Sequence, residues 1–163
     1  SVTGLEAGIK WPNDVVVDGH KVCGILTEMS TEVDYINYVV IGVGINVNQK
    51  VFDEELKEKA TSLMIETGAP VKRSALIAAV MKHFEKNYAL FMENGDLSGL
   101  QESYNEMLVN RGKEVRILEP GNEYNAHAYG INETGELIVR TQKGEEKHIF
   151  AGEVSVRGIY GYV

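Results

Sequence analysis

The segment Val15–Leu26, which reads V-V-V-D-G-H-K-V-C-G-I-L, predicts a β-hairpin. Two apolar runs flank Asp18 and Gly19, and an Asp-Gly pair readily adopts the positive φ angles that a tight hairpin turn requires. The chain around this hairpin is therefore expected to be built on paired strands.

The register of this hairpin brings opposite charges together. With a two-residue turn, Val16 pairs with Lys21, and because side chains alternate between faces, Asp14, Lys21 and Cys23 are expected on one face. Asp14 and Lys21 would then be diagonal neighbours, roughly 7–8 Å apart. Such a pair is either an ordinary ion pair worth less than ~1 kcal/mol or part of a site for phosphate and carboxylate groups.

The pattern outside the hairpin predicts an α+β fold. Residues 35–47 form a nearly continuous β-branched and apolar run, typical of a strand buried on both faces. Helical periodicity follows from Phe52 to Met64 and again from Ile77 to Phe91, whose apolar stripe predicts core packing. A third, short helix is expected at about Ser98–Leu108.

From Lys113 onward the chain alternates short apolar runs with turn residues, which predicts a small all-β barrel. We therefore expect two units. Residues 1–110 would form a mixed or antiparallel sheet with helices, and residues 111–163 would form the barrel.

Composition indicates an ordinary globular protein of 163 residues, with 44% hydrophobic and 25% charged residues. No apolar run approaches the ~20 residues that cross a bilayer. The net charge of −8 argues against a general nucleic-acid binder, and the single cysteine excludes an internal disulfide. We expect a cytoplasmic protein without membrane contact. Because the sequence starts without Met, and motif residues appear by position 10, we expect it to be the C-terminal portion of a longer protein.

A first candidate site is the pentapeptide Lys10-Trp11-Pro12-Asn13-Asp14. Pro12 pushes the preceding residue toward extended backbone and predicts a rigid bend at a strand entrance. The segment offers a cation, an amide and a carboxylate within five residues. It is either part of a ligand site or a surface loop whose tryptophan covers the core.

A second candidate is the segment from Gly42 to Asn48, which reads G-V-G-I-N-V-N. Glycine weakens a strand, so Gly42, Gly44 and the earlier Gly24 suggest a bulge or a close approach to a ligand. The pattern fails as a dinucleotide-binding fingerprint, because no helix starts at the second glycine. Asn46 could bind a purine edge or simply end the strand.

Taken in order, these motifs resemble biotin protein ligase. The resemblance rests on residues 10–14, on Lys21–Glu28 (K-V-C-G-I-L-T-E), on residues 42–48 and on the tail Gly152–Arg157 (G-E-V-S-V-R). It implies a sheet with helices of the class II aminoacyl-tRNA synthetase-like type, followed by a small SH3-like barrel.

The resemblance also implies a reaction. Biotin and ATP, with Mg²⁺, would form biotinyl-5′-AMP, and a lysine of a biotin carboxyl carrier protein would then take the biotinyl group. No transition metal is implied. Other implied associations are a homodimer through the edge of residues 35–43 and DNA binding only in members with an N-terminal winged helix.

Residue roles carried over from the family are expectations at matching positions. Lys21 and Asp14 would be catalytic, and Asp14 would also lie near Mg²⁺. Biotin would lie against Lys21, Gly24, Gly42 and Gly44. The nucleotide would lie near Lys10, Trp11, Asn13, Asn46 and Arg157, with Glu153 as a weaker candidate.

The chain departs from the family in one respect, because the family's upstream Gly/Arg-rich loop does not occur among these 163 residues. We therefore expect about half of the active site here. Two other readings stay open: a related lipoate-type acyl-adenylate ligase, and a non-catalytic biotin-binding or regulatory protein on the same scaffold.

Overall fold

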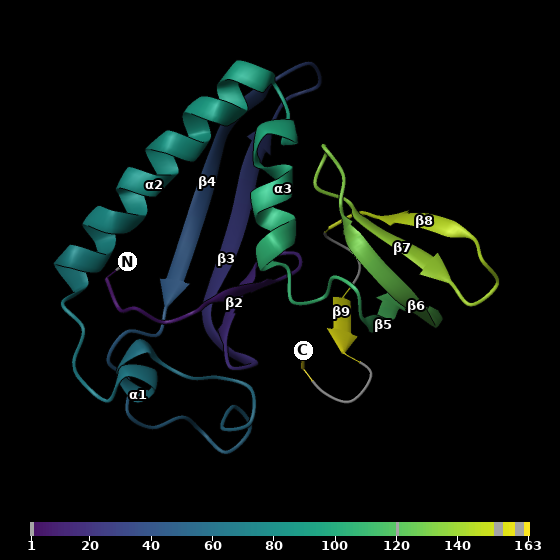
Figure 1. Ribbon diagram of the computed structural model, residues 1–163. Helices are drawn as coiled ribbons and strands as arrows, with labels where there is room; N and C mark the ends of the chain where they lie inside the picture. The colour runs from purple at the N-terminus through teal and green to yellow at the C-terminus, as the bar shows by residue number, and fades with distance from the viewer. Residues whose placement is uncertain (1, 120, 152–154, 159–161) are drawn as a thin grey trace.

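The computed structural model, which describes residues 2–119, 121–151, 155–158 and 162–163, contains two antiparallel sheets and three helices (Figure 1). This confirms the predicted α+β class. The first sheet has the strand order β1-β2-β3-β4 and the second has the order β8-β7-β6-β5-β9. The strands of the first sheet are β1 (Gly8–Lys10), β2 (Asp14–Val17), β3 (His20–Thr31) and β4 (Ile36–Ile45). The second sheet comprises β5 (Glu114–Glu119), β6 (Asn122–Ile131), β7 (Leu137–Thr141), β8 (Glu146–Ile149) and β9 (Ser155–Gly158).

The predicted hairpin forms between β2 and β3. Asp18 and Gly19 make the turn with φ angles of 46° and 78°, and Val16 pairs with Lys21 as expected. The register then shifts at a β-bulge between Val15 and Val16. A bulge places two residues of one strand opposite one residue of the other, and it changes which side chains share a face.

The bulge corrects the predicted face of Cys23. That residue pairs with Val15, whereas Asp14 pairs with Gly24. Cys23 therefore packs in the apolar core on the opposite face from Asp14. Gly24, and not Cys23, lies on the same face as Asp14 and Lys21. A two-residue turn fixes the register only as far as the first irregularity, so the sequence pattern missed this exchange.

One face of the first sheet is covered by the short helix α1 (Leu63–Thr67) and the first turns of α2 (Arg73–Asn94). Leu63 of α1 and Leu76 of α2 pack there against strand residues. The buried members of this cluster are Val17, Val22, Cys23, Val47 and Leu63. The other face of the sheet carries the charged residues Asp14 and Lys21 and the buried Val16.

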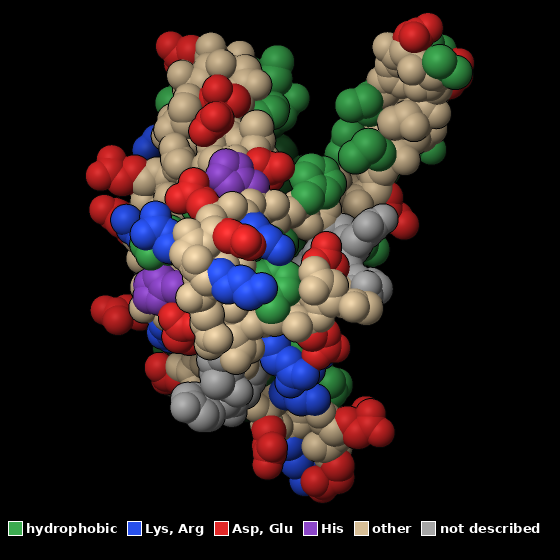
Figure 2. All heavy atoms as spheres, turned by 90° about the vertical axis from the view of Figure 1, so that its right-hand side faces the viewer, with side chains coloured by type: hydrophobic (Ala, Val, Ile, Leu, Met, Phe, Trp, Pro, Cys, Tyr) green, Lys and Arg blue, Asp and Glu red, His purple; other side chains and the backbone are tan. Residues whose placement is uncertain are grey.

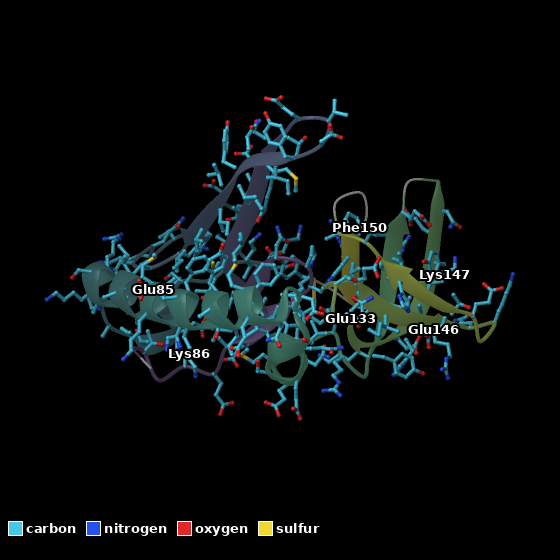
Figure 3. The ribbon with its side chains drawn as sticks, turned by 90° about the horizontal axis from the view of Figure 1, so that it is seen from above. Glu85, Lys86, Glu133, Glu146, Lys147 and Phe150 are labelled. Atoms are coloured by element: carbon cyan, nitrogen blue, oxygen red, sulfur yellow. The ribbon has the colours of Figure 1, made fainter. Side chains whose placement is uncertain are left out.

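Strand β4 differs from its prediction, because it is an exposed edge strand. Its outer edge has no neighbouring strand among the described residues, and every residue from Ile36 to Gly44 is exposed. We call the outer parts of β3 and β4, residues 26–43, the arm. Figure 3 shows the arm projecting away from α2. An apolar run predicts a strand, but only tertiary packing decides whether that strand is covered.

The predictions for the helices are partly confirmed and partly wrong. Helix α2 and helix α3 (Ser98–Met107) lie where periodicity predicted them, and α2 ends at Gly95 with a φ of 77°. The predicted helix at 52–64 is wrong, since only Leu63–Thr67 is helical and turns precede it. The predicted core stripe of α2 is also wrong: Phe84 and Tyr88 stack at 5.6 Å but are half-exposed. Among the described residues no helix is long and apolar enough to span a membrane.

The second sheet carries its own core and is joined firmly to the first. Trp11, which follows β1, is 1% exposed and packs among the buried residues of β5, β6 and β7. Its backbone N–H donates to Asn110 Oδ1 at 2.9 Å, and its indole N–H donates to the Gly135 carbonyl at 3.0 Å. Helix α3 adds a further link, because the Ile131 N–H donates to Asn105 Oδ1 at 2.8 Å. These buried contacts fix the two sheets relative to each other.

Candidate functional site

Four residues form a row on the face of the first sheet that is opposite α1. Lys10 on β1 pairs with Asp14 on β2, Asp14 pairs with Gly24 on β3, and Gly24 pairs with Gly44 on β4. Cross-strand partners have side chains on the same face. The row therefore runs from a cation and a carboxylate to two positions without side chains, and we call it the charged face.

Lys21 and Asp14 meet on this face. Lys21 Nζ lies 2.5 Å from Asp14 Oδ1, closer than the register alone suggested. The backbone of Lys21 is held in place, because its N–H donates to the Lys59 carbonyl at 2.7 Å and its carbonyl accepts from Thr61 at 2.9 Å. Asp14 is only 8% exposed, whereas the Lys21 side chain is 40% exposed. A partly exposed cation on a fixed backbone can receive an anionic ligand.

Gly24 makes room for the lysine. A Cβ atom at Gly24 would lie 2.9 Å from Lys21 Cε and 3.0 Å from Nζ, so the lysine would have to move. Gly44 differs, because the nearest atom to its Cβ position is the Gly24 carbonyl oxygen at 3.7 Å. At Gly42 the nearest atom is the Leu26 carbonyl oxygen at 3.5 Å. A side chain at position 24 would thus displace the flexible end of Lys21, whereas positions 42 and 44 have ordinary space within the chain.

The C-terminal end of the chain reaches the same face. The Tyr162 hydroxyl donates to Asp14 Oδ2, and the Lys10 ammonium lies 4.4 Å from the centre of the Tyr162 ring. Burial and the neighbouring Asp14 carboxylate raise the pKa of Tyr162 above its usual value. Nothing in the sequence singled out Tyr162, because a tyrosine near a chain end carries no motif.

Lys10 is the most deeply buried cation of the face, at 5% exposure. Burial lowers its pKa, Asp14 opposes that shift, and the positive charges of Arg157 and Lys21 add to it. Arg157, on β9, is therefore close enough to Lys10 to act on it electrostatically. Of the sequence-predicted residues, the structure brings together Lys10, Asp14, Lys21, Gly24, Gly44 and Arg157.

The two asparagines are engaged by backbone. Asn13 donates through Nδ2 to the Ile25 carbonyl at 2.7 Å, and Asn46 donates to the Thr61 carbonyl at 3.0 Å. Each side-chain amide therefore forms a hydrogen bond to the backbone of another segment of the chain. Trp11 lies in the core of the second sheet and its indole N–H donates to the Gly135 carbonyl, and this position argues against direct nucleotide contact. Glu153 and the tail residues 152–154 lie outside the described residues.

A metal at Asp14 finds little support in this geometry. Asp14 Oδ1 faces the Lys21 ammonium and Oδ2 accepts from Tyr162, so cationic and hydroxyl partners already occupy the carboxylate. The described part of the chain holds no group of three or more His, Cys, Asp or Glu side chains suited to a metal. Mg²⁺ is usually held by one or two carboxylates together with substrate phosphates and water. We therefore assign no metal-ligand role to Asp14.

Fold and site together define a class of protein: an antiparallel sheet with the charged residues Lys10, Asp14 and Lys21 on one face, joined to a small five-stranded β unit. Two family models match the chain. Residues 2–46 match the biotin/lipoate A/B protein ligase family, and residues 112–157 match the biotin protein ligase C-terminal domain.

Individual relatives agree with these models. The apo structure of biotin protein ligase from Aquifex aeolicus is 31% identical, has a TM-score of 0.85, and aligns over 96% of this chain and 67% of that one. The same ligase in complex with biotin and ATP is 30% identical, with a TM-score of 0.82, and is covered over 64% of its length. The bifunctional ligase/repressor BirA of Bacillus subtilis is 37% identical over 94% of this chain and 47% of its own.

The chain belongs to the biotin protein ligase family. It spans about half the length of the curated relatives that it matches.

Proposed function

We propose that the protein carrying this sequence ligates biotin to a lysine of a biotin carboxyl carrier protein, using ATP and passing through biotinyl-5′-AMP. The observation that carries the proposal is the Lys21–Asp14 pair, which lies over Gly24 and beside the bare position of Gly44. Family membership and the solved relative described as a complex with biotin and ATP support the same substrates. We also propose that the second sheet is the family's SH3-like barrel.

In the first step, a biotin carboxylate oxygen attacks the α-phosphorus of ATP. A new P–O bond forms, the bond to the bridging oxygen breaks, and pyrophosphate leaves with that electron pair. Two anions must approach each other, so a fixed cation between them lowers their repulsion and stabilises the charge that develops on the phosphoryl oxygens. We assign this role to Lys21, whose ammonium is partly exposed on a hydrogen-bonded backbone.

In the second step, the amine of the carrier lysine attacks the acyl carbon of the mixed anhydride. A C–N bond forms, AMP leaves with the electron pair of the acyl C–O bond, and the nitrogen loses a proton to water. Asp14 is the carboxylate of this site. Its Oδ1 lies 2.5 Å from the Lys21 ammonium and its Oδ2 accepts from Tyr162, so we assign it the role of holding that ammonium beside the reacting groups.

We assign the binding of biotin and of the nucleotide to residues on or near the charged face. We assign biotin to the space beside Gly24, Gly42 and Gly44, where positions 42 and 44 lack a side chain although packing within the chain would admit one. We assign the nucleotide to the side of Lys10, Arg157, Asn13 and Asn46. Mg²⁺ enters the proposal only as the counterion of ATP. No step is routed through it.

The proposed partners are a biotin carboxyl carrier protein and a second copy of this chain, in the cytoplasm. The exposed outer edge of β4 supports a homodimer, because an unpaired apolar strand edge is a template for pairing with another strand. DNA binding is proposed only for a protein that also carries a winged helix. No membrane partner is proposed.

Two alternatives remain distinct. A lipoate-type ligase would use the same cation with another acid, and the family model over residues 2–46 includes both kinds of ligase. A non-catalytic binder would keep the scaffold without needing Lys21. The relatives with biotin ligase names favour the first proposal.

Exchange of labelled pyrophosphate into ATP tests the proposal. The assay should be run on the full-length protein that contains this sequence, with biotin, with lipoate and without acid. Biotin-dependent exchange would support the ligase. Exchange only with lipoate would favour the first alternative, and biotin binding without exchange would favour the second.

A further inference from the structure

Tyr162 connects the two sheets at the charged face. Its hydroxyl donates to Asp14 Oδ2, and its ring lies under the Lys10 ammonium at 4.4 Å. Asp14 in turn contacts Lys21 through its other oxygen. The contacts therefore form one chain, from Lys10 through Tyr162 and Asp14 to Lys21.

The end of the chain is packed closely at this place. A Cβ atom at Gly158 on β9 would lie 2.2 Å from the Val163 carbonyl oxygen, a separation that no side chain could adopt. Gly158 thus lets the terminal backbone pass directly against β9. Tyr162 precedes Val163, so its ring is carried by backbone that packs against β9.

We propose that Tyr162 is a positioning residue of the adenylation site, which holds the Asp14 carboxylate against Lys21 and supports the Lys10 ammonium. The expected effect on adenylation rests on the proposed function, whereas the contacts of Tyr162 with Asp14 and Lys10 do not. A carboxylate with one oxygen fixed by a hydroxyl donor has fewer orientations, and its ion-pair partner is fixed with it. Lys21 must point at a developing charge, so its orientation affects the transition state more than the bound substrate.

Tyr124 provides a matched control. It lies on β6, and the ammonium of Lys147, labelled in Figure 3, lies 4.5 Å from its ring centre. The arrangement repeats that of Lys10 and Tyr162, but no residue of the charged face takes part in it. Substitutions at Tyr124 therefore report the general cost of losing a hydroxyl or a cation–π contact.

The contact between Tyr162 and Lys10 can be tested by chemical labelling, which needs no enzyme activity. Lysines are acylated briefly with acetic anhydride near neutral pH, and each site is quantified by peptide mass spectrometry. Tyr162→Leu should raise labelling of Lys10 severalfold because the ring no longer covers it, whereas Tyr162→Phe should not. Tyr124→Leu should raise labelling of Lys147 and leave Lys10 unchanged. Equal labelling of Lys10 in wild type and Tyr162→Leu would overturn the placement of Tyr162.

The positioning role is tested by steady-state pyrophosphate exchange in the full-length protein. Tyr162→Phe should lower kcat about tenfold, the effect of losing one hydrogen bond to a charged group, while the KM for biotin stays within about twofold. Tyr124→Phe should change neither value. A Tyr162→Phe protein with a lower melting temperature but an unchanged kcat would show a merely structural role.

The two failures are distinguishable. A wild-type protein without biotin-dependent exchange would overturn the proposed function, and the labelling result would still decide the contact. A wild-type protein with exchange, combined with an unaffected Tyr162→Phe variant, would overturn the positioning role alone.

Discussion

Lys21 is positioned by three local features: the bulge that follows it in β3, the backbone hydrogen bonds to Lys59 and Thr61, and the empty space at Gly24. The sequence indicated a Lys–Asp pair, and the structure brings the two charged atoms to 2.5 Å. The ion pair alone would contribute little to stability at a partly exposed position. The arrangement fits the role that we propose for Lys21 in ligand binding.

Replacing Lys21 with alanine should slow adenylate formation by about 10²-fold or more, because the cation between two reacting anions is lost. Single-turnover measurement of biotinyl-5′-AMP formation in the full-length protein checks this. Lys143→Ala, at an exposed turn of the second sheet, is the control and should keep the wild-type rate. An unchanged rate in Lys21→Ala would remove the lysine from the mechanism.

Gly24 and Gly44 should respond differently to alanine. At Gly24 the new methyl group meets the flexible end of Lys21, so the fold should persist while kcat for pyrophosphate exchange falls about tenfold. At Gly44 the methyl group makes only ordinary contacts within the chain, so stability should be little changed and the KM for biotin should rise. Melting temperatures, together with kcat and KM from pyrophosphate exchange, distinguish the effects of the two variants. Equal kinetics for both variants would contradict the proposed biotin position.

At the scale of elements, the link between β1 and the second sheet depends on a buried side-chain amide. Asn110 is almost completely buried and accepts the Trp11 backbone N–H at 2.9 Å. Asn110→Ala should lower the free energy of unfolding by about 1–3 kcal/mol, because a buried donor loses its acceptor. Urea unfolding followed by tryptophan fluorescence measures this, since Trp11 is the sole tryptophan. Asn122→Ala, in an exposed hydrogen bond at a turn, is the control, and equal losses would contradict the assigned link.

Local pattern predicted these elements unevenly. Strong signals such as the Asp18-Gly19 turn and the long periodic segment of α2 gave the correct structure. The weaker period of residues 52–64 did not form one helix, because the segment at 59–61 pairs with Lys21 as an added strand-like contact. The role of Trp11 could not be predicted, because the same pentapeptide fits a ligand loop and a core anchor.

At the scale of the whole molecule, the largest apolar exposure lies on the arm and on α2. Figure 2 shows the arm standing apart from the rest of the molecule, with hydrophobic side chains beside the hollow between them. The half-exposed apolar residues of the arm are Leu26, Met29, Tyr35, Ile36, Tyr38, Val39, Val40, Ile41 and Val43. Exposed apolar patches of this kind mark interaction surfaces.

The proposed pairing through β4 predicts concentration-dependent association of this chain. Val40→Lys should shift the monomer–dimer equilibrium toward monomer by about tenfold or more, because an edge lysine opposes strand pairing. Sedimentation velocity over a range of concentrations measures the shift. Phe150→Lys, which charges an exposed position outside the first sheet, is the control. Association unaffected by Val40→Lys would exclude β4 as the interface.

The sequence by itself determined the α+β class, the turn at Asp18-Gly19, the helices at 73–94 and 98–107, and the family to which the ordered motifs belong. These features depend on local backbone preference or on residue identity, which are read along the chain. Tertiary structure alone decided that Gly24 and not Cys23 lies beside Lys21, that Trp11 belongs to the core of the second sheet, and that Tyr162 reaches Asp14 from the far end of the chain. Each of these depends on a bulge or on contacts between distant segments, and the free energy of such contacts is set by packing that no local pattern encodes.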